Sequence, residues 1–353
     1  MGLSLVALGG WPAVLGPLVR GEDLSGDQAA AALAEIFDGN AAPSQIAAFV
    51  TLIHAKGETV EELAALVRTM LDFAEPIPIA ADVVDTCGTG GSAQRRESAF
   101  NVSTIASFVV AGAGARVAKH GGRAASATSS SADLLAALGV EIELGPEGVA
   151  TCVREAGMGF CFAPRFHPAA RHAGPVRREL GVPTMFNFIN PLANPARPRR
   201  QVVGVSDPSL AEKMLGVLER NGASHAMVVY GHDGLDELTT TTTSTILELR
   251  DGEVRVLEVD PEVLGLRSPS AEAPKGGDAA ANADLARRVL DGEAGPHRDI
   301  VLLNAAAGVV TAGLAGDLAE GLDRAKSALD DGRAAEVLER LVAASTASAA
   351  AQA

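Results

Sequence analysis

The segment Val83-Val84-Asp85-Thr86-Cys87-Gly88-Thr89-Gly90-Gly91-Ser92 indicates the fold class of this chain. Its apolar start predicts a short buried strand. Three glycines within four residues then allow the backbone to bend so that successive N–H groups point at one spot, which makes a cradle for phosphate. Similar short apolar runs, most of them separated by helical stretches, follow at residues 116–118, 141–144, 160–163, 202–205, 226–229 and 300–303. This alternation predicts an α/β fold with a mostly parallel central sheet flanked by helices.

Two flanking regions complete the expected architecture. Residues 245–249 and 253–257, on either side of Asp251-Gly252, read as an antiparallel hairpin added to the sheet. Residues 17 to about 75 read as helices only, with helix starts at 24–27, 43–45 and 59–62. Pro76 and Pro78 close this block. We therefore expect a helical domain at residues 1–76 and an α/β domain at residues 77–345.

Composition excludes several classes of function. The chain has 353 residues, is 47% hydrophobic and carries a net charge of −15, from 29 Lys and Arg against 44 Asp and Glu. A chain this acidic has no global affinity for nucleic acid or an anionic membrane, so an anionic substrate needs a local site. Aromatic residues make up only 3%, which argues against a base-stacking platform. The uncharged run 300–316 is interpreted as a buried strand followed by a buried helix rather than a membrane span.

The cysteines and the N-terminal segment indicate the compartment. Three cysteines, Cys87, Cys152 and Cys161, are an odd number and match no zinc spacing. Residues 1–23 are mildly apolar but lack a basic start, and Gly and Pro interrupt them. They predict a first helix with an irregular lead-in rather than a signal peptide. We therefore expect a reduced, cytoplasmic protein.

Two segments carry candidate anion ligands. After the glycine-rich loop, Asn101-Val102-Ser103-Thr104 opens a helix whose first amides and dipole favour an anion. The match of the glycines to a dinucleotide fingerprint is weak, because the helix starts late and no acidic residue follows about twenty positions on. Lys119 and Arg123, followed by the hydroxyl-rich run 126–131 and another helix start, form the second candidate. The alternative for this run is a flexible loop.

Two further segments are charged. Asp236-Glu237 follows the expected strand 227–230 and fits Mg²⁺, which takes one or two carboxylates plus substrate phosphates. The alternative is a solvated acidic turn. Residues 165–200 contain seven arginines (165, 171, 177, 178, 197, 199 and 200) and only Glu179 as an acid, which indicates an anion site or a solvated connector. Together these features predict a metal-bound polyanion with phosphate at two ends, lying across the C-terminal edge of the sheet.

The chain resembles the bacterial anthranilate phosphoribosyltransferases from about residue 20 to residue 330. The stretches that carry the resemblance are DTCGTGGS (85–92), FNVSTIASFVVAGAGARVAKHGGRAAS (100–126), SSSADLLAALGV (129–140), FCFAPRFHPAARHAGPVRRELGVPTMFN (160–187), NPARPRRQVVGV (194–205), VVYGHDGLDELTTTTTST (228–245) and IVLLNAAAG (300–308). The combination is highly specific, although each piece alone is not.

The resemblance implies a nucleoside phosphorylase/phosphoribosyltransferase-like fold, in which a segment near 168–195 joins the helical domain. It also implies a homodimer through that domain. The implied reaction transfers ribose phosphate from phosphoribosyl pyrophosphate (PRPP) to the amine of anthranilate, with Mg²⁺ as cofactor, in tryptophan biosynthesis. The implied PRPP ligands are Gly88, Gly90, Gly91, Ser92, Asn101, Ser103, Thr104, Lys119, Ser126 and Ser131. The implied anthranilate contacts are Gly88, His120, Gly122, His167, Arg177 and Pro191, and the implied metal ligands are Ser103, Asp236 and Glu237. No residue is assigned covalent or acid–base catalysis.

The chain departs from the family pattern at several positions. It has Ser92 in place of an Asp, about three extra residues before Asn101, and Gly122 in place of an Asn that contacts anthranilate. Asn190 and Ser130 stand where the family has glycines.

Three alternatives stay open at the level of sequence. The first is a paralogous phosphoribosyltransferase that takes another aromatic acceptor in specialised metabolism. The second is a pyrimidine nucleoside phosphorylase, which shares the architecture but does not need the Asp236-Glu237 metal site. The third is a catalytically silent nucleic-acid-binding relative, against which the net charge of −15 counts.

Overall fold

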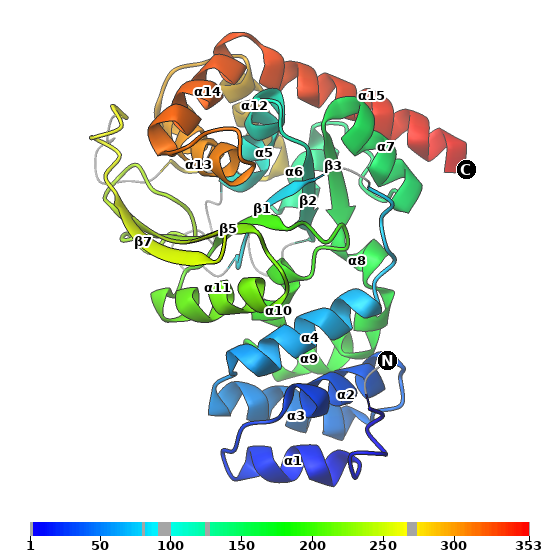
Figure 1. The fold of residues 1–353 in the computed structure, drawn as a ribbon. Coiled ribbons are helices and arrows are strands. Elements are labelled where there is room, and N and C mark those ends of the chain that lie inside the picture. The colour runs from blue at the N-terminus through cyan, green and yellow to red at the C-terminus, as the bar shows by residue number, and fades with distance from the viewer. Residues whose placement is uncertain (1–2, 80–81, 91–99, 124–127, 267–273, 353) are drawn as a thin grey trace.

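The computed structural model describes residues 3–79, 82–90, 100–123, 128–266 and 274–352. A seven-stranded sheet forms its centre, in the order β3-β2-β1-β4-β5-β6-β7 (Figure 1). The strands are β1 (Val84–Gly88), β2 (Val117–Gly121), β3 (Met158–Phe162), β4 (Arg200–Gly204), β5 (His225–Gly231), β6 (Ser244–Arg250) and β7 (Glu253–Val259). Strands β1 to β5 are parallel, and β6 and β7 are antiparallel additions. The mostly parallel sheet expected from the sequence is confirmed.

Helices cover both faces of the sheet (Figure 1). One face carries α5 (Val102–Gly112) and α13 (Pro296–Thr311), which contact β1, and around them lie α6 (Ser131–Ala137), α7 (Pro146–Ala156), α12 (Ala279–Leu290), α14 (Leu318–Asp330) and α15 (Arg333–Gln352). The opposite face carries α11 (Ala211–Arg220), which contacts β5 and β6. Because apolar helices shield both sides, the central strands are buried along nearly their whole length.

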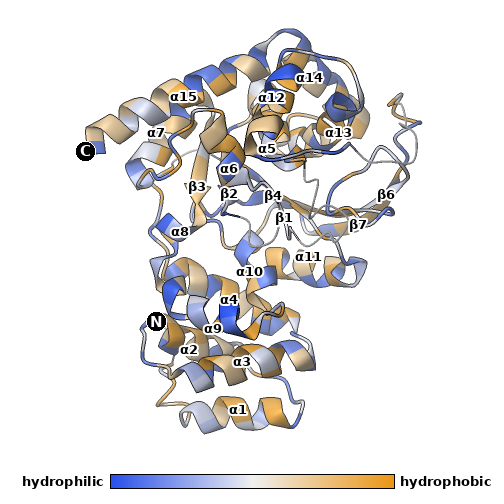
Figure 2. Ribbon diagram, turned by 180° about the vertical axis from the view of Figure 1, so that it is seen from behind, coloured by the Kyte–Doolittle hydropathy of each residue, from blue (hydrophilic) through white to orange (hydrophobic). Residues whose placement is uncertain are grey.

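The N-terminal helices pack as a bundle below the sheet (Figure 1). They are α1 (Trp11–Val19), α2 (Gly26–Phe37), α3 (Pro43–Lys56) and α4 (Val60–Asp72). Ser25 and Thr59 begin α2 and α4 with capping boxes, as their sequence signals predict. The bundle helices carry hydrophobic and hydrophilic residues on different sides, as Figure 2 shows, and their apolar sides meet in one core.

Residues 163–192 form the short helical elements α8 (Ala163–Phe166), η2 (Pro168–His172), α9 (Gly174–Leu180) and α10 (Phe186–Leu192). Val176, Phe186 and Ile189 from this segment are buried in the same core as the N-terminal helices. That core continues onto the α11 face of the sheet through Val203 and Val228. The segment therefore links the bundle to the sheet edge where the substrate site is expected.

Two expected strands are wrong. Residues 141–144 form an irregular stretch between α6 and α7, and residues 300–303 lie inside α13. Residues 300–311 of α13 are all buried, so this helix has no polar face. Without a polar face an apolar run shows no helical period, and sequence pattern cannot distinguish it from a buried strand.

The expected hairpin is confirmed. The hairpin of β6 and β7 turns at Asp251 (φ 53°) and Gly252 (φ 83°), the left-handed pair that a tight hairpin requires. Among the residues that the structure describes, no helix is long and apolar enough to cross a membrane.

Candidate active site at the sheet edge

The C-terminal ends of β1 and β4 lie side by side, with Gly88 paired to Gly204. From β1 the chain crosses to β2 on one side, whereas β4 and β5 lie on the other, so the order of strands reverses here. In open parallel sheets this reversal leaves a crevice at the carboxyl ends of the strands, where ligands bind. Both predicted phosphate segments, after β1 and after β2, start at this edge.

The loop after β5 lies across these two glycines. A Cβ on Gly204 would lie 1.7 Å from the Asp236 carbonyl oxygen, and one on Gly88 would lie 2.8 Å from Asp236 Oδ2. The amide of Gly90, whose φ is +65°, donates a hydrogen bond to Asp236 Oδ2 at 2.9 Å. The glycine-rich loop after β1 is therefore in direct contact with the loop after β5 that carries the predicted metal ligands Asp236 and Glu237, hereafter the metal loop.

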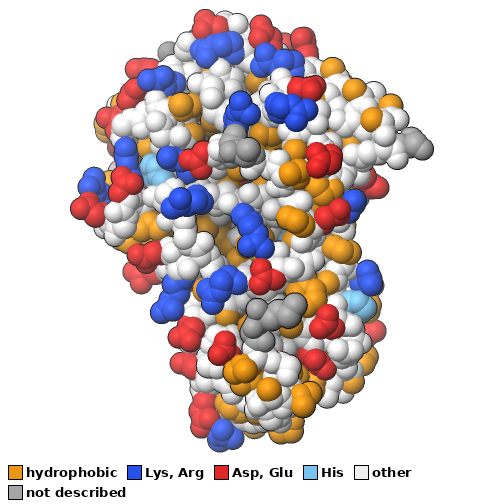
Figure 3. Space-filling view, turned by 45° about the vertical axis from the view of Figure 1, so that its right-hand side comes forward, with side chains coloured by type: hydrophobic (Ala, Val, Ile, Leu, Met, Phe, Trp, Pro, Cys, Tyr) orange, Lys and Arg blue, Asp and Glu red, His pale blue; other side chains and the backbone are white. Residues whose placement is uncertain are grey.

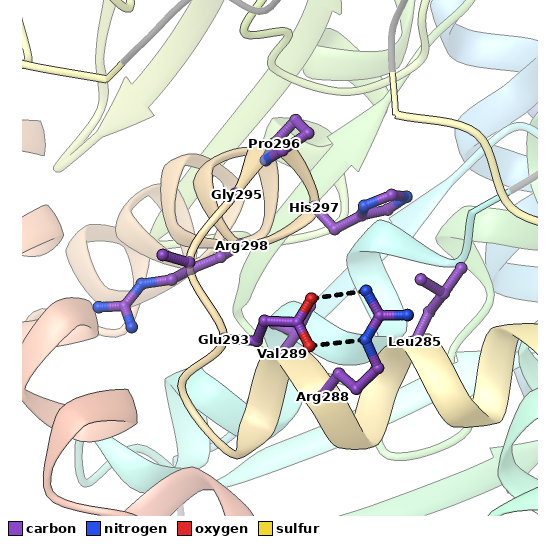
Figure 4. A pocket seen from close by; sticks show the side chains of 9 residues that line it. Leu285, Arg288, Val289, Glu293, Gly295, Pro296, His297 and Arg298 are labelled. Atoms are coloured by element: carbon purple, nitrogen blue, oxygen red, sulfur yellow. Dashed lines mark hydrogen bonds and ion pairs between the residues drawn. The ribbon is translucent and has the colours of Figure 1, made fainter.

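A small, partly open pocket lies at this meeting point, lined by residues that include Thr86, Ser103, Gly204, Asp236, Glu237 and Asn304. A larger pocket lies at the end of α12 and the start of α13 (Figure 4). Its Arg288 is bound to Glu293 through two hydrogen bonds of 2.7 and 2.5 Å, and its Arg298 pairs with Asp330. Because these cations are already neutralised within the protein, the smaller cavity is the better candidate for an anionic substrate.

Lys119 supplies positive charge under the cavity. Its side chain is 1% exposed, and its Nζ donates to the Thr86 carbonyl oxygen at 2.5 Å and to Ser103 Oγ at 3.3 Å. Burial lowers the pKa of Lys119, while the negative charge of Asp85 acts in the opposite direction. A buried ammonium that contacts Ser103 is suited to an anion that enters beside it.

Asp85 organises the interior of this edge. It accepts hydrogen bonds from the His120 amide at 3.1 Å, from Asn194 Nδ2 at 2.9 Å and from Gln201 Nε2 at 3.2 Å. Burial raises its pKa, and Lys119 and these three donors counteract the shift. Gln201 also donates to the Pro191 carbonyl oxygen at 3.0 Å, so this network ties α10 to β1 and β4.

Asn101 begins α5 and joins three segments. Its Oδ1 accepts from Ser129 Oγ at 3.0 Å and from Asn282 Nδ2, on α12, at 2.9 Å. Thr104 Oγ1 donates to Ser131 Oγ at 3.0 Å. The helix start after the glycine loop and the serine run are therefore adjacent, as a shared phosphate site requires.

The predicted anthranilate contacts His120, His167 and Pro191 come from β2 and from the segment between β3 and β4. The rings of His120 and His167 are 5.4 Å apart, and His167 Nε2 lies 2.9 Å from the Ala193 carbonyl oxygen. Burial lowers the pKa of His167 to about 4 and that of His120 well below its usual value, so both rings are neutral near pH 7. Cys87 Sγ donates to the Pro191 carbonyl oxygen at 3.4 Å.

Arg177 lies on α9, and its guanidinium stacks over the ring of Phe186 at 4.7 Å. Burial lowers its pKa. Within the described part of the chain no ion pair is found for Arg177. Its side chain is half-buried, whereas that of its neighbour Arg178 is exposed. A half-buried guanidinium of this kind is suited to a carboxylate from a ligand.

Three arginines of the arginine-rich segment 165–200 are already paired with acids of this chain. Arg165 pairs with Glu75, Arg197 with Asp72 and Arg200 with Asp82. Asp72 ends α4, and Glu75 and Asp82 lie between α4 and β1, so three of the seven arginines attach the segment to the end of the bundle and to the linker that follows it. Figure 3 shows basic and acidic side chains interspersed over one face of the molecule.

Most of the predicted site residues come together at this edge. Gly91, Ser92 and Ser126 lie outside the described residues. Gly122 follows β2, and an added Cβ there would meet only Ala163 Cβ, at an ordinary 3.7 Å. Sequence reasoning assigned no role to Asn194, Gln201, Asn282 and Asn304. For Asn304 a signal existed, since it is a single amide within the apolar run 300–310.

The donor set fits Mg²⁺. Asp236, Glu237 and Ser103 line one cavity and offer only oxygen ligands. Over the described ranges there is no group of three or more His, Cys, Asp or Glu that would hold a metal alone. Mg²⁺ is usually bound by one or two carboxylates together with substrate phosphates, which matches this arrangement.

Comparison with known proteins agrees with this geometry. Residues 12–74 match the helical bundle domain of a glycosyl transferase family, and residues 80–335 match its a/b domain. An anthranilate phosphoribosyltransferase of Rhodococcus jostii is 52% identical over 94% of this chain and 92% of its own length. The crystal structure of the Thermus thermophilus enzyme is 40% identical, with a TM-score of 0.87, over 94% of this chain and 98% of that one.

A Saccharomyces cerevisiae enzyme, solved in complex with PRPP and Mg, is 23% identical and shares the fold with a TM-score of 0.86, over 96% of this chain and 98% of its own. On its sequence and its architecture, the chain belongs to the anthranilate phosphoribosyltransferase family.

Proposed function

We propose that this protein transfers the ribose phosphate of PRPP to the amine of anthranilate and releases pyrophosphate, a step of tryptophan biosynthesis. The observation that carries the proposal is the contact between Gly90 and Asp236, which joins a phosphate loop to a metal loop over the buried Lys119. The R. jostii relative bears the name of the same activity.

The PRPP side is assigned to the β1 and β2 segments. Gly88, Gly90 and Gly91 would present amides to the substrate, with Ser92 beside them. The start of α5 and the serine run would bind phosphate through Asn101, Ser103, Thr104, Ser126 and Ser131, with Lys119 below them. Asp236 and Glu237, with Ser103, would hold Mg²⁺, which when bound neutralises charge that builds on the leaving pyrophosphate. The yeast enzyme was solved with both PRPP and Mg.

The acceptor side is assigned to the segment between β3 and β4 and to the end of β2. Arg177 would bind the carboxylate of anthranilate in a bidentate geometry. Gly88, Gly122 and Pro191 would enclose the ring, together with the neutral imidazoles of His120 and His167. The amine would then lie between the PRPP side and the acceptor side of the site.

The catalytic strategy proposed is positioning without a covalent intermediate. Cys87 is the nucleophile nearest to the glycine loop, but burial raises the pKa of its thiol well above the usual value, so it stays protonated. Both neighbouring histidines have lowered pKa values and are poor bases. Rate acceleration then comes from holding the amine near C1 of the ribose while the metal loop stabilises the leaving group.

We also propose a two-domain organisation, with a helical domain formed by residues 1–76 and the segment near 168–195, and an α/β domain at 77–345. The packing of α9 and α10 in one core with α1–α4 supports the assignment of the segment near 168–195 to the helical domain. A homodimer through the helical domain is part of the same proposal. A cytoplasmic location accords with three free thiols.

The experiment that tests the function is steady-state turnover of PRPP against a panel of aromatic amines, with pyrophosphate release as the signal. We expect anthranilate to be the preferred acceptor, full dependence on Mg²⁺, and loss in excess EDTA. Asp236→Asn combined with Glu237→Gln should lower the rate by about a hundredfold or more, the scale of losing strong electrostatic stabilisation. Phosphorolysis of thymidine without PRPP turnover would refute the proposal, and preference for another amine would indicate a paralogue with a different acceptor.

A further inference from the structure

One polar side chain of α13 points into the metal loop. In the buried run 300–311 of this helix, Asn304 is the only amide side chain, and the residue is 8% exposed. A buried amide requires hydrogen-bond partners, because leaving it unpaired in an apolar environment is costly. The partners therefore indicate what this side chain does.

The carboxamide of Asn304 binds both backbone groups of one residue. Its Nδ2 donates to the Leu238 carbonyl oxygen at 2.8 Å, and its Oδ1 accepts from the Leu238 amide at 3.0 Å. A third bond, from Nδ2 to the Ile300 carbonyl oxygen at 2.9 Å, fixes the side chain to its own helix. Only a group with a donor and an acceptor side by side forms this two-point contact, so neither Asp nor Leu can replace it.

The residue that is held directly follows the two carboxylates. Leu238 comes after Asp236-Glu237, and its side chain is fully buried. On the other side of the pair, the Gly231 amide donates to the Leu235 carbonyl oxygen at 2.9 Å. The backbone that carries both carboxylates is therefore held at each end, once by β5 and once by α13.

We propose that Asn304 is a positioning residue for the metal-binding carboxylates, holding Asp236 and Glu237 in the geometry that binds a divalent cation. The proposal rests on the proposed function only for the identity of those metal ligands. Partners that orient the ligands of a metal influence its affinity strongly, by about 10- to 100-fold on mutation.

The test measures metal binding directly, with the full chain and Mn²⁺ as the probe in the presence of PRPP, since the two carboxylates bind the metal together with substrate phosphates, and PRPP with Mn²⁺ but no protein gives the baseline. Free Mn²⁺ is followed by electron paramagnetic resonance for the wild type, Asn304→Asp and Asn304→Ala. Asn304→Asp keeps the shape of the side chain and removes both donated hydrogen bonds, and Asn304→Ala removes the contact entirely. The matched control is Thr311→Val, which changes another buried polar residue of the same helix.

We expect each Asn304 variant to bind Mn²⁺ about tenfold more weakly or worse, while Thr311→Val binds like the wild type. Activity of the Asn304 variants should recover partly at high Mg²⁺, which a general loss of folding would not permit. Unchanged Mn²⁺ affinity in a folded Asn304 variant overturns the proposal. So does wild-type Mn²⁺ binding that is absent or that survives Asp236→Asn with Glu237→Gln.

The outcome separates the two proposals. If the wild type binds Mn²⁺ through Asp236 and Glu237 but does not use anthranilate, the proposed function fails and the role of Asn304 stands. If anthranilate is turned over but the Asn304 variants bind the metal normally, the function stands and Asn304 serves only the fold.

Discussion

Gly204→Ala tests whether the metal loop requires its close approach to β4. The added Cβ would lie 1.7 Å from the Asp236 carbonyl oxygen, whereas a carbon–oxygen contact needs about 3.3 Å, so one partner must move by roughly 1.6 Å. Strand β4 lies between β1 and β5 and is buried from Gln201 to Gly204, so it has little freedom to yield. The metal loop therefore moves instead.

The expected cost is large for activity and moderate for stability. Misplacing a catalytic group by about 1 Å costs on the order of a hundredfold in rate, and overpacking a buried site costs about 1–3 kcal/mol. We expect kcat/KM for PRPP to fall by about a hundredfold or more in a variant that still unfolds cooperatively.

The assay is steady-state kinetics at saturating anthranilate, together with thermal unfolding followed by circular dichroism. Gly316→Ala is the control, because its Cβ would meet Glu320 Oε2 at an ordinary 3.5 Å in an exposed loop. A folded Gly204→Ala enzyme with wild-type kinetics and metal requirement would refute the claim that the 236–238 backbone is fixed against β4.

Three further predictions concern the acceptor side. Arg177→Lys should raise the KM for anthranilate far more than that for PRPP, because Lys cannot form the bidentate contact, and equal effects on both would assign Arg177 to phosphate or to packing. The pKa of His167 is lowered from 6.5 to about 4, so the unfolded chain takes up a proton at a higher pH than the folded one, and stability should fall as the pH drops from 6.5 to 4, by about 3 kcal/mol from this group. Urea unfolding at several pH values should show a flatter profile for His167→Gln, and an unchanged profile would contradict the assignment. Gly122→Asn should leave kcat/KM for anthranilate equal or better, since an added Cβ has room there, and a severe loss would favour a different native acceptor.

Local chemistry explains why much of the site was predictable. The glycines after β1 are recognisable because a strand that turns into a phosphate loop needs backbone freedom, and Gly90 indeed has a φ of +65°. The capped starts of α2 at Ser25 and of α4 at Thr59, and the hairpin turn at Asp251-Gly252, follow from residue preferences that act within a few positions. Parallel strands place their C-terminal ends at one edge, so motifs after successive strands were expected to converge there.

Other features depend on contacts that no local pattern encodes. Residues 300–303 lie in α13, which packs against α5 and α14. Because this part of the helix is buried on all sides, its sequence has no polar face and therefore no helical period. The composition of 165–200 predicts an anion site or a solvated connector, but Arg165, Arg197 and Arg200 pair with acids that lie more than 80 residues earlier. Their partners depend on how the segment folds back against the bundle.

The order of the motifs, the cluster of glycines after β1 and the oxygen-donor pair at 236–237 are properties of the sequence, because they depend on residue type and short spacing. The folded chain alone decides that Gly204 lies under Asp236, that Asn304 binds Leu238, and that His120 meets His167. These residues are separated by dozens of positions, and strand order, register and the packing of helices on the sheet bring them together. The proposed function requires both levels, since the loops would supply the ligands and the tertiary packing fixes where those loops lie.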